Sequence, residues 1–432
     1  MSQYATPGDA QTAPSKIGLY TSPHLRFVRE RIQIDNKPIA EDLFAQYFFE
    51  VWDRLEAAAA AEGAPADGPT KPVYFRYLTL MALHAYLKEG VDSAVIECGI
   101  GGEFDSTNIL ANPTVTAVTS LGIDHTAMLG STLPEIAWHK AGIFKQGSVA
   151  FTAVQKEEVM TVLKARVAER GTRLHIIDIH PTLANNEIKL GLGAAFQKIN
   201  ASVAIAVAAA HLRALGHTSV PDPTTVAHIE LPPQFICGLE QVRWAGRCEI
   251  RREKNVAWHI DGGHTMESIE VTGQWFAEQI AAATSTSTPE STVPRILIFN
   301  QQTRDANALA KALHAALQSG MTSRSKSPFT HVIFTTNQTF SEGYKPDLVS
   351  MNTNQQDVDT LAVQKALANT WSDIDTTAEV HVVRTIEEAV RTARNVAHEY
   401  MKRIGADAEI MVLVTGSLHL VGGALEVLET AE

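Results

Sequence analysis

Short apolar runs alternate with longer segments of helical periodicity in the first half of the chain. Apolar residues recur at helical spacing over residues 40–61, and residues 75–88 have the same character. Two compact apolar runs, 93–98 and 115–121, are typical of buried strands, and each leads directly into glycine or polar residues. Strands that alternate with helices in this way predict a mostly parallel sheet covered by helices.

A second set of elements begins near residue 244. Apolar runs at 257–260, 295–300, 331–336 and 411–415 predict further strands, and the first two are followed by polar residues. Ligands of parallel sheets bind beyond the carboxyl ends of the strands. The polar motifs of both halves are therefore the candidates for chemistry.

The length of 432 residues exceeds one ordinary core, so we expect two domains. Residues 1–16 are polar, with proline and glycine, and are expected to be a loose segment. The change of elements around Pro232-Pro233 places the boundary nearby. We expect a first α/β domain at residues 17–237 and a second at 238–432.

The composition narrows the classes of function. The net charge of -12 means that the molecule as a whole lacks the positive charge typical of nucleic-acid-binding proteins. No apolar run is long enough to span a membrane. Three cysteines form no paired framework, which suits a reducing compartment. The first residues have neither an apolar signal core nor an arginine, so we expect a cytoplasmic protein. A mitochondrial form from another start site stays open.

Three residues at predicted strand ends could hold a cation. Glu97 closes one strand, His125 follows the next, and Ser22 stands where a third strand stops. A carboxylate, a hydroxyl and an imidazole can together bind a divalent ion. Each has an ordinary alternative: Glu97 as a structural acid bonded to the glycine turn, His125 as a loop residue, and Ser22 as a turn serine.

Further candidates are weaker when taken singly. Asp261 and His264 form an Asp-Gly-Gly-His turn after a strand, where glycines allow a ligand to approach the backbone. Arg247 offers a planar fork for phosphate or carboxylate. Lys140 is expected on a helix. Each could equally be a plain turn residue or an exposed charge.

A local basic cluster follows Ser22. Arg26, Arg29 and Arg31 stand close together in an otherwise acidic protein, with Glu30 among them. The cluster could face a polyanionic substrate, or it could be the solvated face of a strand.

Taken together, the motifs closely resemble the folylpolyglutamate synthases of the Mur-ligase superfamily, in their eukaryotic form. Their order and spacing are kept from about residue 17 to residue 428. The motifs are YTSPHLRFVRERIQI (20–34), YFRYLTLMALHAYL (74–87), VIECGIGGEFDSTNIL (95–110), SLGIDHTAMLGSTLPEIAWHKAGIFK (120–145), WAGRCE (244–249), HIDGGHTMES (259–268) and VLVTGSLHLVGGAL (412–425).

The resemblance implies a mostly parallel ATPase-type domain followed by a smaller Rossmann-like domain, with ATP between them. The implied reaction is the ATP-dependent addition of L-glutamate to the γ-carboxylate of a reduced folate, through an acyl phosphate. ATP and Mg²⁺ are the implied cofactors, and a monomer is expected. Dihydrofolate synthases use the same scaffold on dihydropteroate, and the FRYLT segment favours polyglutamylation.

The resemblance also assigns roles to individual residues. The magnesium ligands would be Ser22, Glu97 and His125, and Lys140 matches a lysine that is carbamylated in some members. His264 matches the histidine of the carboxyl-domain Asp-Gly-Ala-His motif, which reads Asp-Gly-Gly-His here. The family's nucleotide contacts match three positions: Asn200, Arg247 and Asp261. Part of its folate pocket matches two: Phe75 and Arg76.

One family motif is not found. The glycine-rich loop that holds the triphosphate should precede the YTSPHL strand, but no G-x-x-x-x-G-K-[S/T] occurs in the sequence. We therefore expect the first domain to be incomplete at its amino terminus, with weakened ATP binding and exposed strand edges. Two interpretations follow: an incomplete gene model, or a degenerate relative that binds folate or a partner without catalysis.

Overall fold

The chain folds into two compact units. The structure is a computed structural model that describes residues 1–5, 14–63, 68–225, 230–284, 293–302, 304–321, 327–342, 360–404 and 409–430. The first unit comprises Met1–His24, Val28–Gly191 and Phe196–Val242. The second comprises Arg243–Glu432 together with two short segments, Leu25–Phe27 and Leu192–Ala195.

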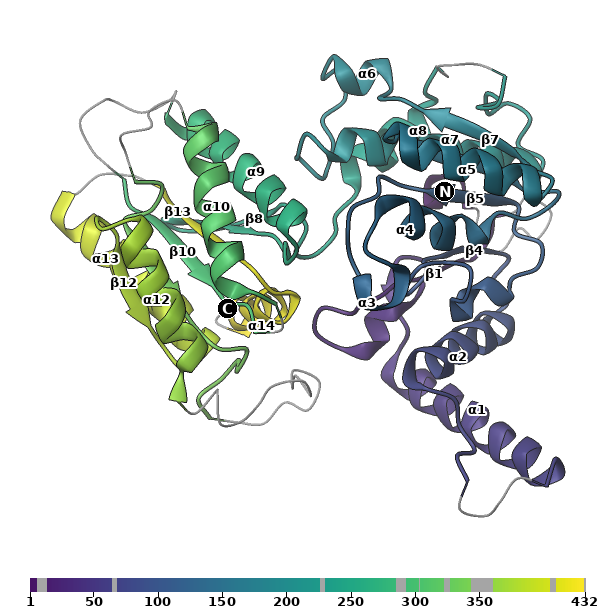
Figure 1. The fold of residues 1–432 in the computed structure, drawn as a ribbon, viewed down its shortest axis with the longest axis horizontal. Coiled ribbons are helices and arrows are strands. Elements are labelled where there is room, and N and C mark those ends of the chain that lie inside the picture. Colours follow the sequence, from purple (N-terminus) through teal and green to yellow (C-terminus); the bar gives the residue numbers. More distant parts are fainter. Residues whose placement is uncertain are drawn as a thin grey trace. The chain divides into compact units, whose positions relative to one another are not determined.

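The first unit begins with a four-stranded sheet in the order β3-β2-β1-β4; β1 and β4 are labelled in Figure 1. Its strands are β1 (Ile17–Tyr20), β2 (Ile32–Ile34), β3 (Lys37–Pro38) and β4 (Ser93–Ile96). β1 pairs in parallel with β4, whereas β1–β2 and β2–β3 are antiparallel. Apolar side chains of α1 (Glu41–Ala61) and α2 (Tyr74–Glu89) pack on this sheet in one core, which includes Tyr20, Ile32 and Met81. Both helices have nearly the predicted bounds.

The strand expected at residues 93–98 is shorter and more exposed than predicted. β4 ends at Ile96, and Val95 retains 45% of its exposed surface. The apolar run suggested a buried strand because parallel strands usually have neighbours on both sides. Here β4 is the outer strand of its sheet and pairs with β1 alone, so the expectation of burial was wrong.

A second, three-stranded parallel sheet completes the first unit. Its strands are β5 (Val115–Val118), β6 (Val149–Ala153) and β7 (Arg173–Ile177). Apolar residues of α4 (Leu133–Lys140) and α5 (Glu157–Glu169) form a core with β5 and β6. The longer helix α7 (Gln197–Ala214) also contacts the sheet.

His211 of α7 connects the two sheets at their starting ends. Its Nε2 lies 3.1 Å from Ser93 Oγ, at the first residue of β4, and its Nδ1 lies 2.6 Å from Thr114 Oγ1, just before β5. Burial lowers the pKa of His211. A neutral imidazole with one partner on each nitrogen therefore holds β4 and β5 close together at these ends.

The remaining elements of the first unit are short. They are η1 (Ser2–Tyr4), η2 (Val28–Arg31), η3 (Ser106–Ile109), η4 (Ala141–Ile143), α3 (Thr126–Leu129), α6 (Pro181–Ala184) and α8 (Pro233–Gln241). The segment 1–16 was expected to be loose, but η1 is ordered and the Tyr4 ring packs edge-on against Phe235 of α8, with centroids 5.8 Å apart. Most of the segment, residues 6–13, lies outside the described residues.

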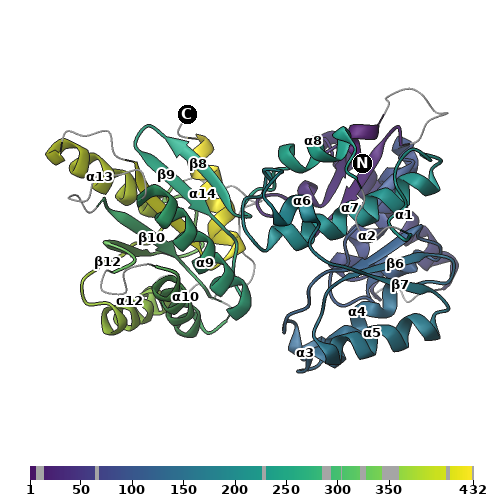
Figure 2. The same ribbon diagram turned by 90° about the horizontal axis from the view of Figure 1, so that it is seen from above.

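The second unit is a six-stranded sheet with helices on both faces (Figures 1 and 2). In the order β12-β11-β10-β13-β9-β8, every pair is parallel except β9–β8. The strands are β8 (Glu249–Glu253), β9 (Val256–Ile260), β10 (Arg295–Phe299), β11 (His331–Phe334), β12 (Glu379–Val382) and β13 (Ile410–Thr415). This is the α/β architecture that the sequence predicted.

Two apolar cores sandwich this sheet. Helices α9 (Met266–Thr284), α10 (Ala306–Gly320) and α12 (Ala362–Ile374) cover one face, around Phe276, Leu313 and Trp371. Helices α13 (Ile386–Ile404) and α14 (Leu418–Thr430) cover the other. β9 and β13 are buried throughout, and their sequences are apolar except for His259 and Thr415.

Within the described part of the chain, no helix combines the length and the apolar character needed to cross a bilayer.

Candidate ligase site

Ser22 and Glu97 meet where β1 and β4 end. Tyr20 pairs with Ile96 in the parallel register, so the next residues of both strands emerge at the same edge of the sheet. The Glu97 amide donates to the Tyr20 carbonyl at 2.9 Å, and the Ser22 amide donates to Glu97 Oε2 at 3.0 Å. Two of the three predicted magnesium ligands are therefore neighbours, although 75 residues separate them.

Asp105 organises the glycine turn that follows Glu97. Its Oδ2 accepts hydrogen bonds from the amides of Gly99 (3.0 Å) and Ile100 (2.9 Å). Its Oδ1 accepts from the amide of Thr107 and so caps η3. Sequence reasoning missed Asp105, although an Asp followed by Ser-Thr is a recognisable helix start. Its carboxylate occupies the structural role that had been left open for Glu97.

Lys140 lies beside this turn, at the last position of α4. A Cβ at Gly102 would come within 2.8 Å of the Lys140 carbonyl oxygen, so only glycine allows the turn to pack against the end of α4. Burial raises the pKa of the Cys98 thiol, and the charges of Asp105, Lys140 and Glu97 also act on it. The half-buried thiol of Cys98 also accepts a hydrogen bond from Thr107 Oγ1 at 3.4 Å.

His125 stands immediately before α3, with a left-handed backbone at φ +53°. Its amide donates to Asp124 Oδ1 at 2.7 Å, and its Nε2 lies 3.8 Å from Asp124 Oδ2. A Cβ at Gly101 would lie 2.8 Å from Leu129 of α3, so α3 also packs against the glycine turn. The elements that carry His125, Lys140 and Glu97 thus converge on residues 99–102.

Phe75 forms a wall of the same turn. Its ring lies over Gly99, where a Cβ would meet the ring at 2.5 Å, and it packs 5.9 Å from the ring of Tyr20. Arg76, next to it at the start of α2, is exposed. The predicted folate-pocket pair therefore offers one apolar surface and one cation near the end of β4.

Asn200 lies on the first turn of α7. Its Nδ2 donates to Gln197 Oε1 at 3.0 Å, within the same helix. Its predicted role in nucleotide binding stays a prediction.

In the second unit, Asp261 is buried and bonded on both oxygens. Oδ2 accepts from the amide of Cys248 at 2.9 Å and from its thiol at 3.3 Å. Oδ1 accepts from the amide of Gly263 at 2.9 Å and from Thr272 Oγ1 at 2.7 Å. Four internal donors occupy the carboxylate, which is 6% exposed. Its geometry favours a role in positioning the Arg247–Cys248 turn over direct contact with a nucleotide.

Arg247 and His264 flank Gly262. A Cβ on Gly262 would lie 3.0 Å from Arg247 Nη1, and His264 Nδ1 lies 2.9 Å from the Gly262 carbonyl oxygen. Because a carbonyl oxygen only accepts, Nδ1 carries the hydrogen, and in the neutral imidazole Nε2 carries the lone pair. The His264 amide donates to Ser268 Oγ at 3.0 Å, which fixes the residue at the start of α9.

Two arginines of the basic cluster, Arg29 and Arg31, have hydrogen-bond partners within the first unit. Arg31 is buried and its Nε donates to His24 Nδ1 at 2.9 Å, whereas Arg29 Nη1 donates to the carbonyl oxygen of Ile39 at 2.9 Å. The burial of Arg31 contradicts a solvated face at that position. The polyanion-binding role stays a prediction.

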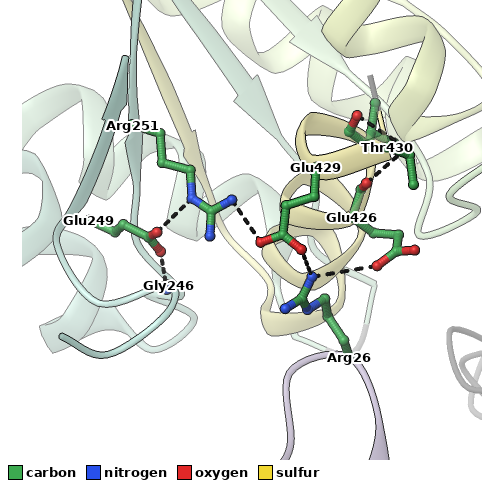
Figure 3. A network of polar contacts seen from close by, with 8 residues as sticks. Arg26, Gly246, Glu249, Arg251, Glu426, Glu429 and Thr430 are labelled. Atoms are coloured by element: carbon green, nitrogen blue, oxygen red, sulfur yellow. Dashed lines mark hydrogen bonds and ion pairs between the residues drawn. The ribbon is translucent and has the colours of Figure 1, made fainter. Parts of the chain in front are cut away.

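Arg26 belongs to a network of charges in the second unit (Figure 3). It pairs with Glu429 and, at 3.5 Å, with Glu426 of α14. Arg251 of β8 binds the other oxygen of Glu429 at 2.9 Å and Glu249 at 2.6 Å. This network attaches the segment Leu25–Phe27, which directly follows the Ser22 turn in sequence, to α14 and β8.

The comparisons with known proteins agree on one family. The chain is 45% identical over 425 residues to a folylpolyglutamate synthase of Neurospora crassa, covering 97% of this chain and 76% of that protein. It is 43% identical to a probable folylpolyglutamate synthase of Schizosaccharomyces pombe (98% and 78% covered) and 44% identical to the Saccharomyces cerevisiae enzyme (96% and 72%). The chain belongs to the folylpolyglutamate synthase family. No protein-family model matches it.

Solved structures of the family share the fold. A Mycobacterium tuberculosis folylpolyglutamate synthase, complexed with ADP and AMPPCP, aligns with a TM-score of 0.69 at 21% identity, over 99% of this chain and 92% of that one. The apo form of L. casei FPGS gives a TM-score of 0.65 at 23% identity (96% and 84% covered). A folylpolyglutamate synthase complex with AMPPCP and folate gives 0.62 at 23% identity (96% and 83%). The two-domain fold predicted from the sequence is thereby confirmed.

Proposed function

We propose that the protein is an ATP-dependent ligase that adds L-glutamate to the γ-carboxylate of tetrahydrofolate. The observation that carries this proposal is the junction of Ser22 and Glu97 beside the glycine turn, in a chain 45% identical to a folylpolyglutamate synthase. A carboxylate is a poor electrophile, so it must first be phosphorylated. The glutamate amine then attacks the acyl phosphate through a tetrahedral intermediate and phosphate leaves.

The residues at the end of β1 and β4 fit a magnesium ion. The Glu97 carboxylate and the Ser22 hydroxyl are oxygen donors, which Mg²⁺ prefers, and the Ser22 amide orients Glu97 by a hydrogen bond. When bound, Mg²⁺ would neutralise charge on the transferred phosphoryl group. His125 is the third proposed ligand, and Lys140, alone or as its carbamate, would act beside them.

The proposal gives the chain's other residues specific tasks. Phe75 supports the folate on its apolar surface, and Arg76 supplies a cation for a folate carboxylate. Arg247 contacts the nucleotide and stabilises negative charge during phosphoryl transfer. His264, held by the carbonyl of Gly262, presents its Nε2 lone pair as a proton acceptor. Asn200 completes the proposed nucleotide contacts, and Asp261 holds the turn that bears Arg247.

We further place the first domain at residues 17–237 and the second at 238–432, and infer a cytoplasmic monomer. Sedimentation of the purified chain tests the monomeric state, which predicts a particle of 46.9 kDa.

Product analysis tests the activity. The purified chain is incubated with tetrahydrofolate, L-glutamate, ATP and Mg²⁺, and the folates are separated by mass. We expect folates lengthened by single glutamate units, with one ADP formed per unit, and no reaction when ATP or Mg²⁺ is omitted. Dihydropteroate in place of tetrahydrofolate distinguishes a dihydrofolate synthase, which would convert it.

A second candidate is a folate-binding relative without catalysis. The observation that favours it is that G-x-x-x-x-G-K-[S/T] does not occur in the 432 residues. Calorimetry with folate and with Mg-ATP separates the two candidates, in the chain as it stands and in a chain joined to the glycine-rich segment of a relative. Folate binding without nucleotide binding in both chains supports the second candidate, and Mg-dependent ATP binding contradicts it.

A further inference from the structure

His331, Glu379 and His381 form a compact group on the second unit, remote in sequence from the ligase motifs. One ligand atom of each residue lies within 4.8 Å of those of the other two. His331 Nε2 is 3.6 Å from Glu379 Oε2, and His381 Nε2 is 3.5 Å from Glu379 Oε1. The two imidazole planes are almost parallel, at 8°.

The backbone of the sheet creates this arrangement. His331 and Glu379 are the first residues of the parallel strands β11 and β12 and are direct partners in the register. His381 is two residues beyond Glu379, so its side chain leaves β12 on the same face. β12 is the outermost strand of the sheet, and the group is therefore accessible from one side. The side chains of the two histidines retain 20% and 26% of their exposed surface.

Thr330 contacts the second ring nitrogen of His331. Its hydroxyl lies 3.0 Å from the carbonyl oxygen of Arg295 and accepts the Arg295 amide at 3.2 Å. Thr330 Oγ1 also lies 2.9 Å from His331 Nδ1, which carries the hydrogen in the tautomer that leaves the hydroxyl hydrogen on the Arg295 carbonyl. The lone pair of His331 is then on Nε2, directed toward Glu379.

His381 places a second imidazole nitrogen next to the other carboxylate oxygen of Glu379. Its Nε2 is buried and makes no hydrogen bond within the described structure. Two imidazole nitrogens thus adjoin both oxygens of one carboxylate, and a cation among them would satisfy all of these atoms.

We propose that His331, Glu379 and His381 bind one divalent transition-metal ion of the zinc class. Ligands at about 2.0–2.1 Å around a tetrahedral zinc ion lie roughly 3.3–3.5 Å apart, which the two nitrogen–oxygen distances already approach. The third distance closes by rotation of the side chains. The Thr330 contact matches the hydrogen bond that metal-binding histidines make through their second nitrogen.

The ligand set selects against magnesium. Mg²⁺ takes oxygen ligands and keeps its waters, whereas two imidazoles and one carboxylate suit zinc and its neighbours, with water in the fourth position. The ion would attach the outer strand β12 to β11. This site uses none of the residues of the proposed ligase site and does not depend on the proposed function.

Zinc titration of the metal-stripped, tag-free full chain tests the proposal. Calorimetry is run with millimolar Mg²⁺ present, which masks sites made only of oxygen ligands. We expect one zinc ion per chain, visible absorption typical of four-coordinate Co²⁺ on cobalt substitution, and a rise in melting temperature with zinc. His381→Gln and Glu379→Gln should each weaken zinc binding at least about 100-fold and abolish the zinc-dependent rise.

His84→Gln is the matched control, because His84 pairs with Glu50 at 2.6 Å but has no second imidazole. Its zinc affinity should equal that of the unchanged chain, and circular dichroism checks that all variants fold. The proposal is overturned if the unchanged chain binds no zinc in magnesium buffer. It is equally overturned if His381→Gln and Glu379→Gln bind as tightly as the unchanged chain, or if His84→Gln alone loses the ion.

Discussion

The backbone amide of Ser22 donates a hydrogen bond to the carboxylate of Glu97 at 3.0 Å. This contact joins the ends of two parallel strands and fixes the direction of the carboxylate. A carboxylate with one oxygen held by an amide is oriented in advance for a cation, which lowers the cost of binding. The relationship is the structural centre of the proposed ligase site.

The first prediction concerns Glu103, which anchors the far end of the glycine turn to α5. It pairs with Arg166, whose side chain is 4% exposed, and with Arg170 at 2.7 Å. Glu103→Gln would leave the buried guanidinium of Arg166 with only the exposed carboxylate of Glu169 as its anion, so we expect the free energy of unfolding to fall by about 2 kcal/mol. Urea denaturation measures the change.

Glu409→Gln is the control for that measurement. Glu409 pairs with Arg252 at 2.9 Å, but the two side chains are 45% and 62% exposed. An exposed pair contributes little, so the loss should be below about 0.5 kcal/mol. Equal losses in the two variants would show that burial does not strengthen the Glu103 pair.

The second prediction concerns Asp261, whose two oxygens accept from four donors. Asn at this position would direct an amide group toward hydrogen-bond donors, and we expect a loss of about 2–3 kcal/mol in the free energy of unfolding. Asp305→Asn provides the comparison. Asp305 caps α10 by accepting from Ala308, and Asn caps equally well, so its stability should be unchanged. A stable Asp261→Asn variant would contradict the positioning role.

Much of the fold could be predicted from the sequence, because its signals are local. The apolar runs of β9, β10 and β13 and the periodicity of α1 and α2 gave nearly correct bounds. β12 was missed because Glu-Val-His-Val contains no apolar run. The exposure of Val95 was missed because it depends on which strands are neighbours, and a sequence pattern does not contain that information.

The candidate sites also differ in whether a sequence signal predicts them. The nearness of Ser22 and Glu97 followed from the rule that parallel strands end at one edge of the sheet. The binding role of Asp105 in the turn had a local signal, a cap before Ser-Thr, that was overlooked. The group formed by His331 and Glu379 had none, because it exists only through the register of β11 with β12 across a long intervening segment.

The third prediction compares two glycines with left-handed backbones. Gly416 has φ +107°, and a Cβ there would lie 2.7 Å from the Asn300 carbonyl oxygen. Gly147 has φ +82°, and a Cβ there would meet nothing within 4 Å. Gly147→Ala should cost about 1–2 kcal/mol from backbone conformation alone. Gly416→Ala adds a clash and should cost roughly 2 kcal/mol more by thermal or urea unfolding; equal costs would contradict the close packing.

The fourth prediction is a pH dependence from His259, which is buried between Trp275 and Phe276. Burial lowers its pKa to about 4, whereas the unfolded chain has its ordinary value near 6.5. The unfolded state therefore binds the proton first as the pH falls. The stabilisation is complete above about pH 6.5 and is lost progressively down to about pH 4, by roughly 3 kcal/mol in total.

His259→Gln removes this titration. The difference in unfolding free energy between the unchanged chain and His259→Gln should therefore vary between pH 4 and 6.5 and be constant above that range. His398→Gln alters an exposed histidine and should keep the pH dependence of the unchanged chain. A constant difference across the whole range would show that His259 accepts its proton as easily in the folded state.

The most direct test of the ligase site measures ATP-dependent incorporation of labelled glutamate into tetrahydrofolate by Glu97→Gln. Glu97→Gln is compared with the chain that keeps Glu97, both in the chain as it stands and in the chain joined to a relative's glycine-rich segment. Glu158→Gln of α5 is the control, because Glu158 is exposed. Removing a charge that binds the phosphoryl-linked metal should lower incorporation by about 100-fold or more. Glu158→Gln should retain full activity. Equal incorporation by Glu97→Gln and by the protein that keeps Glu97 would contradict the proposed ligase site. The absence of incorporation by the protein that keeps Glu97, both as it stands and with the added glycine-rich segment, would also contradict it.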